Sequence, residues 1–372
     1  EYLGIRHIEE SFSKELIEAS KKRNGPVFSI DENNGPFSNK FIINSLSNLV
    51  RYELQDFKNW KISNQNLASD ARAVLEYTQL NQILINKYFD TNLWAKYFAL
   101  MELLPSHHGA IPKSVRYYLN PVSGLFEPAF YDGHRVSVWT DGLFIKVDDF
   151  LISDFINLTD DDLIDQKCPL RYCEARRWFQ SFFGDAENID INFYENYFNA
   201  LKIFSSRNYE RNFIDKSLDE LSPIRGAIYR EFHKYDLIDY GGLLPHVEQI
   251  SQIKKRIKLL RSSLEDAENK KPYISISNKN ILMLNRTSKL PQIINLYCKN
   301  KIVDKIILPF GLIYRVNSNL YEECDINELN YSLKKNSEIY KITETQLGNS
   351  DFEERLIDST GIKIINHKSF NE

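Results

Sequence analysis

The spacing of apolar residues changes near residue 270 of this 372-residue chain, and no other feature constrains its fold class as strongly. From about Ser153 to Leu264, apolar residues recur at intervals of three and four, as on one face of an α-helix. After Pro272 they occur in short runs such as YISIS, ILMLN and QIINLYC, separated by polar turns, which is typical of β-strands. The sequence therefore predicts an α+β protein: a mostly helical part over 1–270 and a small all-β module over 271–372.

The residues before Ser153 combine short strands with helices. Asp90 is placed to cap the N-terminus of a strongly apolar helix, NLWAKYFALMELL. The segment 120–124 predicts a turn between two strands, because Pro121 presets the turn and Gly124 allows a positive φ angle. Further strands are expected over 2–8 and 27–31, and further helices over 13–22 (with Gly25 just past its end), 39–51, 69–87 and from about 246 to 264.

Charge and hydropathy argue against two kinds of partner. The net charge is -4 and the isoelectric point is near 6.1, so the chain lacks the basic character that nucleic-acid binding requires. No apolar run approaches the roughly 18–20 residues that span a bilayer. The chain opens with EYLGIRHIEE, without an initiator methionine or a signal-like segment, so we expect a piece of a longer protein whose location depends on further residues.

Four cysteines, Cys168, Cys173, Cys298 and Cys324, raise the question of metal binding or disulfide formation. Cys168 and Cys173 lie close together, but no histidine or second cysteine pair has the spacing of a zinc site. We therefore expect unpaired structural thiols. A Cys168–Cys173 disulfide is the alternative if the protein is exported.

The stretch from Asp90 to His134 has an order of elements that suits phosphoryl transfer. A helix leads into a polar loop with two histidines, and a strand, a turn, a second strand and an Asp-Gly pair follow. Such a helix can support a catalytic loop, while the strands carry the chain to a carboxylate that holds Mg²⁺ against nucleotide phosphates. Asp132 is the candidate carboxylate. The alternative is a turn-capping aspartate, since Asp-Gly is a common turn pair.

The segments FDTNLWAKYFALMELL, HHG and RYYLNPVSGLFEPAFYDG resemble the pattern of the CotH family of atypical kinase-like proteins, named after a spore-coat kinase. The opening GIRHIEESFSKELIEASKKRNGPVFSIDE also resembles that family, in which paired acids precede a short helix and a turn. The similarity covers about residues 2–270 and is most specific over 4–32 and 89–133. It implies a protein-kinase-like fold with a mostly helical C-lobe, and phosphate transfer from ATP to protein hydroxyls with Mg²⁺ or Mn²⁺.

The resemblance also assigns roles to individual residues. Asp132 matches the metal-binding aspartate at the end of the second strand. Glu9 and Glu10 match the acidic pair near the kinase hinge, and Glu10 is the candidate for cofactor binding. The loop HHGAIPKS departs from the kinase pattern, because Gly109 occupies the position of the catalytic aspartate. Ser114 occupies the position of the metal-binding asparagine, where its hydroxyl would be a weaker ligand.

Because Gly109 cannot accept a proton, His108 or His107 would have to act as the base, and a neutral imidazole is competent near pH 7. Alternatively, the histidines shape the loop through hydrogen bonds. The nucleotide-binding lysine of a kinase and its glutamate partner would lie upstream of residue 1. Three functions stay open: an active atypical kinase, a pseudokinase that works through protein contacts, and a surface or envelope scaffold. The resemblance favours an extracytoplasmic or cell-envelope location and a protein as substrate or partner.

Overall fold

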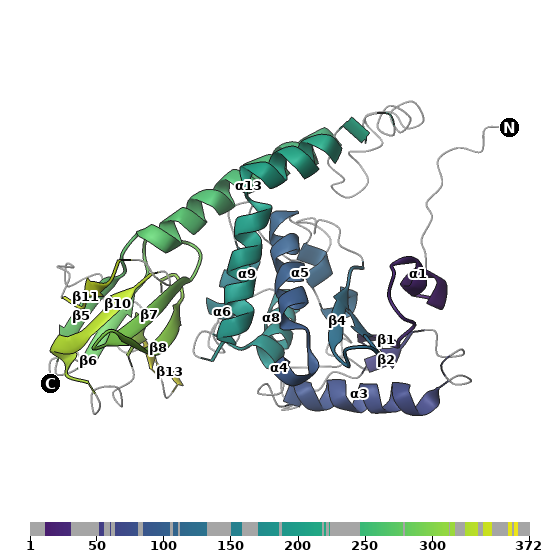
Figure 1. The fold of residues 1–372 in the computed structure, drawn as a ribbon, viewed down its shortest axis with the longest axis horizontal. Coiled ribbons are helices and arrows are strands. Elements are labelled where there is room, and N and C mark those ends of the chain that lie inside the picture. Colours follow the sequence, from purple (N-terminus) through teal and green to yellow (C-terminus); the bar gives the residue numbers. More distant parts are fainter. Residues whose placement is uncertain are drawn as a thin grey trace.

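The structure is a computed structural model that describes residues 12–30, 52–55, 60, 64–80, 85–104, 107–110, 112–131, 150–157, 170–185, 188–217, 219–220, 223, 246–277, 280–311, 313–316, 324–333, 338–343, 356–358 and 361–363. The strand predicted over 2–8, the helix predicted over 39–51, and the residues Glu9, Glu10, Asp132 and Cys168 lie outside these ranges. Figure 1 shows an elongated molecule, in which helix α13 (His246–Asn269) runs from the helical part to the C-terminal strands. The α+β class that the sequence predicts is confirmed.

The first sheet has the strand order β2-β1-β3-β4, and its neighbouring strands are antiparallel. Its strands are β1 (Val27–Ile30), β2 (Tyr52–Leu54), β3 (Arg116–Leu119) and β4 (Phe126–Ala129). Strands β3 and β4 form the predicted hairpin. The Gly124 amide donates to the Asn120 carbonyl oxygen at 2.8 Å, and Gly124 has a φ of +73°. The turn prediction over 120–124 is therefore confirmed.

Helix α1 (Lys14–Ala19) is shorter than the predicted helix over 13–22. Lys21 follows it with a φ of +59°, which breaks the helical conformation before Gly25 is reached. Gly25 serves a different purpose. A Cβ atom at this position would lie 2.3 Å from the Leu119 carbonyl oxygen, so only glycine lets the segment pass this close to β3.

The described residues between 151 and 269 are mostly helical, as predicted. Asp90 caps α5 (Thr91–Leu103), because its Oδ1 accepts a hydrogen bond from the Leu93 amide at 2.9 Å. The helix predicted over 69–87 begins earlier, as α3 (Gln65–Leu80), and α4 (Ile85–Tyr88) is separate. The other helices are α6 (Leu151–Asn157), α8 (Leu170–Phe183), α9 (Ile191–Phe204) and α10 (Arg207–Tyr209), followed by a π-helical turn over Glu210–Asp215. Among the described ranges, no helix is long and apolar enough to cross a membrane.

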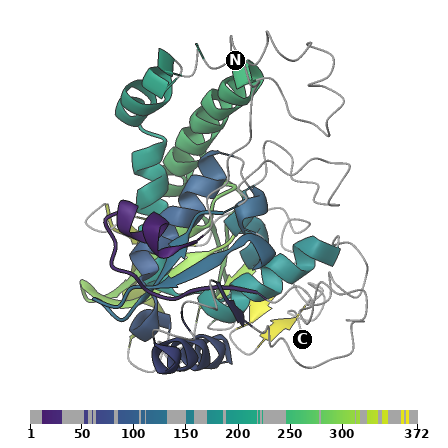
Figure 2. The same cartoon turned by 90° about the vertical axis from the view of Figure 1, so that its right-hand side faces the viewer.

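An aromatic core holds these helices together. Trp94 and Phe98 of α5 are fully buried and contact rings on α8 and α9. Phe183 of α8 stacks on Phe193 of α9 with ring centroids 4.3 Å apart. The side chains of Ile257, Leu260 and Leu264 join the same core, which confirms that the predicted stripe of the last helix is a core face. Figure 2 shows α3, in dark blue, below the strands, where it contacts β2, while α13, in green, rises above them.

The C-terminal module contains two sheets. One has the order β11-β10-β7-β8 and is antiparallel, and the other has the order β13-β12-β9-β6-β5 with one parallel pair, β12 with β9. Lys299 and Asn300 connect β7 to β8 with positive φ angles, as a two-residue hairpin turn of the primed type requires. The strands are β5 (Tyr273–Ser277), β6 (Asn280–Leu284), β7 (Gln292–Cys298), β8 (Lys301–Leu308), β9 (Ile313–Arg315), β10 (Leu329–Ser332), β11 (Tyr340–Lys341), β12 (Leu356–Asp358) and β13 (Gly361–Lys363). The β-rich character predicted for the C-terminal part is confirmed.

Cys298 and Cys324 form a disulfide inside this module, so the expectation of unpaired thiols is wrong for these two residues. Cys298 ends β7, and Cys324 lies shortly before β10, which pairs with β7. Both cysteines belong to the core that the two sheets enclose. The sequence separates them by 26 residues, and only the pairing of β10 with β7 makes their proximity visible.

The packing is continuous where helix gives way to strand. Helix α13 ends at Asn269, and β5 begins at Tyr273. Leu290 and Ile307 of the module lie in the same apolar core as the helices. The Tyr194 hydroxyl of α9 donates to the Pro291 carbonyl oxygen at 3.0 Å. The module is therefore held against α9 and α13 by buried contacts.

Candidate functional site

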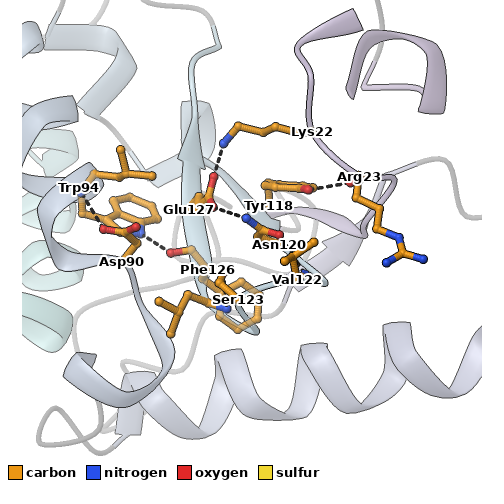
Figure 3. A network of polar contacts seen from close by, with 12 residues as sticks. Lys22, Arg23, Asp90, Trp94, Tyr118, Asn120, Val122, Ser123, Phe126 and Glu127 are labelled. Carbon is orange, nitrogen blue, oxygen red and sulfur yellow. Dashed lines mark hydrogen bonds and ion pairs between the residues drawn. The ribbon is translucent and has the colours of Figure 1, made fainter. Parts of the chain in front are cut away.

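Helix α5 and the β3–β4 hairpin form a closed unit that carries the predicted catalytic loop. The Trp94 indole Nε1 donates to the Phe126 carbonyl oxygen at 2.9 Å, and the Asp90 amide donates to the same oxygen at 3.0 Å (Figure 3). The start of β4 is thereby attached to the N-terminus of α5. Beyond the C-terminus of α5, the loop that contains the two histidines leads into β3.

The predicted catalytic loop contains two short 3₁₀ turns, His107–Ala110 and Pro112–Ser114. The Tyr97 hydroxyl of α5 donates to the Gly109 carbonyl oxygen at 2.5 Å, which fixes the loop against the helix. Ser114 is only 1% exposed. The structure describes the backbone of His107 and His108 but not their side chains.

The hairpin register brings the two ends of the predicted site together. Arg116, at the start of β3, pairs with Ala129, at the end of β4. The loop that precedes β3 and the chain that leaves β4 therefore lie at the same end of the hairpin. The chain leaves β4 through Phe130, which is 53% exposed, and Tyr131. Asp132, the next residue, lies outside the described residues.

A polar network that sequence reasoning missed ties residues 20–26 to the outer face of the hairpin (Figure 3). Glu127, which is buried, forms an ion pair with Lys22 and accepts a hydrogen bond from the Asn120 side-chain amide at 2.7 Å. The Tyr118 hydroxyl donates to the Arg23 carbonyl oxygen at 2.6 Å. Burial, and then the nearby Glu127 carboxylate, raise the pKa of Tyr118 to about 12.

This network has a structural role. The carboxylate of Glu127 is satisfied by Lys22 and Asn120, and the Lys22 ammonium lies 5.1 Å from the centre of the Tyr118 ring. It holds the N-terminal segment on the hairpin without leaving an acid directed at solvent. The only sequence signal for it is the FEP run after the predicted turn, and the partner Lys22 lies 105 residues away.

A second cluster of potential ligands lies in the C-terminal module. Cys298, Cys324 and Glu328 have ligand atoms within 4.8 Å of one another. Both sulfur atoms belong to the disulfide, and metal binding requires free thiolates. We therefore assign no metal site to this cluster.

The buried tyrosines around α5 predict a steep loss of stability in alkali. Burial is the largest cause of raised pKa values for Tyr52, Tyr97, Tyr117, Tyr194 and Tyr197. The unfolded chain releases these protons near pH 10, whereas the folded protein keeps them, so stability is fully present below pH 10 and falls as the pH rises further. Each tyrosine contributes about 1.4 kcal/mol per pH unit to this fall. Circular dichroism during an alkaline titration should show cooperative unfolding above pH 10, and gradual ionisation in a folded protein would contradict the prediction.

Comparison with models of known protein families and with curated proteins gave no match for this chain. The resemblance to the CotH family therefore remains a proposal. The geometry of the hairpin and loop is what can be brought to bear on it.

Proposed function

We propose that this chain is the C-terminal part of a CotH-type, kinase-like phosphotransferase that moves phosphate from Mg²⁺- or Mn²⁺-bound ATP to protein hydroxyls. The observation that carries the proposal is the β3–β4 register, in which Arg116 pairs with Ala129. This register puts the loop over 107–114 beside the chain segment that leads to Asp132. A catalytic loop next to a metal-binding aspartate is the arrangement on which phosphoryl transfer depends.

In this proposal each candidate residue has one task. Asp132 would hold the divalent cation through a carboxylate oxygen, the hard type of donor that Mg²⁺ and Mn²⁺ prefer. His108, or His107, would accept the proton of the attacking hydroxyl, since Gly109 offers no side chain for this purpose. Glu10 would contact the cofactor, and Ser114 would assist it only after a local rearrangement, because its side chain is buried.

A pseudokinase or scaffold is the second candidate, and Gly109 together with the burial of Ser114 favours it. Two positions that supply the base and a metal ligand in kinases contribute neither to the surface of this loop. The disulfide in the C-terminal module supports a location in an oxidising, extracytoplasmic compartment for either candidate. A protein is the expected substrate or partner in both cases.

The test is incorporation of labelled phosphate from ATP, with Mg²⁺ or Mn²⁺, by the full-length protein. We expect Asp132→Ala to abolish incorporation and His108→Ala to lower its rate by about 100-fold or more, the usual contribution of a general base. Asp219→Ala, at an exposed position in the described helical part, serves as the matched control and should retain full activity.

Two other outcomes identify the alternatives. Thermal stabilisation by metal-bound ATP without incorporation would indicate a pseudokinase. Absence of both stabilisation and incorporation in the wild type would contradict nucleotide binding and leave the scaffold function.

A further inference from the structure

The β3–β4 hairpin carries a buried arginine at the end where the predicted site lies. Arg116 is 8% exposed and opens β3. It pairs with Ala129, and Tyr131 follows two residues later, so an extended chain directs Tyr131 to the same face as Arg116. The Arg116 guanidinium carbon lies 4.0 Å from the centre of the Tyr131 ring. At this distance a guanidinium is attracted to the face of an aromatic ring.

Tyr131 is also supported on its other side. Its ring lies 5.7 Å from the ring of Phe12, in the N-terminal segment that covers the hairpin. The chain leaving β4 is therefore held between a cation from β3 and an aromatic ring from the segment before α1. Phe130, its neighbour, is 53% exposed and has no comparable support from burial.

Arg116 acts on the loop side of the site as well. Tyr97 holds the loop through its hydrogen bond to the Gly109 carbonyl oxygen. Burial raises the pKa of Tyr97, and the positive charge of Arg116 opposes this rise. The guanidinium also lowers the pKa of Tyr117, whose dominant shift is again the rise caused by burial. One charge thus lies near both the helix residue that fixes the loop and the residue that precedes Asp132.

We propose that Arg116 is a positioning residue of the phosphate-transfer site. By stacking on Tyr131, it fixes the direction in which the chain leaves β4 and so sets where Asp132 begins. An arginine suits this task, because its guanidinium is planar and stays charged at all physiological pH values, whereas a lysine offers no plane to stack. This inference rests on the proposed function, since positioning matters only if metal-bound ATP occupies the site.

The experiment measures the affinity of the full-length protein for Mn²⁺-bound ATP by calorimetry, together with labelled-phosphate incorporation. The variants are Arg116→Met, Arg116→Lys, Tyr131→Leu and the double variant Arg116→Met/Tyr131→Leu. We expect about tenfold weaker affinity for Arg116→Met, the equivalent of one cation–π contact of moderate strength. Arg116→Lys should recover part of this loss. The double variant should bind no more weakly than the worse single variant, because both changes remove one contact.

Lys271→Met is the matched control. Lys271 lies 3.9 Å from the centre of the Tyr340 ring, so its loss removes a cation–π pair of similar geometry in the C-terminal module. We expect this variant to keep the wild-type affinity for Mn²⁺-bound ATP. All affinities are measured at a temperature at which near-ultraviolet circular dichroism shows each variant to be folded.

The outcomes separate this inference from the proposed function. If the wild type binds and Arg116→Met lowers only the melting temperature, with unchanged affinity, the positioning role is overturned while the proposed function stands. If Lys271→Met weakens binding as much as Arg116→Met, the effect is not specific to the site, and the inference is again overturned. If the wild type itself neither binds nor transfers phosphate, the proposed function fails first.

Discussion

Replacing Glu102 with alanine is expected to lower the free energy of unfolding by about 3–5 kcal/mol, the usual cost of breaking a buried ion pair. Glu102 of α5 is 0% exposed, and Arg256 of α13, its partner, is 1% exposed. The Arg256 Nη2 donates to Glu102 Oε2 at 2.5 Å, and its Nε donates to the Glu102 carbonyl oxygen at 3.0 Å. The other carboxylate oxygen accepts the Ile152 amide at 3.0 Å. One carboxylate therefore joins α5, α6 and α13.

The cost arises from what the mutation leaves behind. In Glu102→Ala, the Arg256 guanidinium stays buried against the Phe150 ring, 4.7 Å away, without its carboxylate. The Ile152 amide also loses its acceptor. Urea unfolding, followed by circular dichroism, measures the change. Glu76→Ala is the control, because its exposed ion pair with Arg72 should contribute about 0.5 kcal/mol or less.

A double variant tests whether the charge itself causes the loss. Glu102→Leu/Arg256→Met removes both charges and keeps apolar volume, so it should be more stable than Glu102→Ala alone. The Ile152 amide would still lack its acceptor, so we expect partial recovery. A Glu102→Ala protein with wild-type stability would contradict the buried pair.

Loss of the Cys298–Cys324 disulfide is expected to lower stability by about 3–4 kcal/mol, the chain-entropy estimate for a closed loop of this length. The bond joins residues separated by 26 positions and lies in the core between the two C-terminal sheets. Its removal frees the segment before β10 in the unfolded state and, in the native state, removes a link beside the pairing of Leu329 with Cys298. The effect should appear as a lower urea midpoint for Cys298→Ala/Cys324→Ala.

Thiol titration separates this bond from the other two cysteines. In a Cys168→Ala/Cys173→Ala background, the denatured and unreduced protein should show no reactive thiol, and two should appear after reduction. The oxidised and reduced forms of this background can then be compared directly in urea. Two free thiols before reduction, or equal stability of the two forms, would refute the prediction.

Local sequence patterns identified the parts of the site that depend on neighbouring residues. The apolar run QIINLYC coincides with β7, Asp90 caps α5, and the segment 120–124 forms the hairpin turn. These features follow from strand alternation, capping and turn chemistry, which act over a few residues. The helix boundaries were less well predicted, because α1 ends where Lys21 takes a positive φ angle and no glycine announces it.

The functional expectations depended on such local patterns as well. The order of helix, histidine loop and hairpin could be read before Ser153, and the structure brings the loop and the end of β4 to one end of the hairpin. Arg116 attracted no attention in the sequence, because its significance arises from the ring of Tyr131 across the hairpin. The same holds for Lys22, whose partner Glu127 lies on another element.

The sequence by itself determined the α+β class, the change from helix to strand near residue 270, and the hairpin that carries the candidate site. The tertiary structure alone decided which distant residues meet: Glu102 with Arg256, Lys22 with Glu127, Cys298 with Cys324, and β1 with β3. The physical reason is that secondary structure reflects hydrogen bonds and side-chain preferences within a few residues. Long-range pairs depend on how helices and sheets pack, and no periodicity in one segment encodes its partner in another.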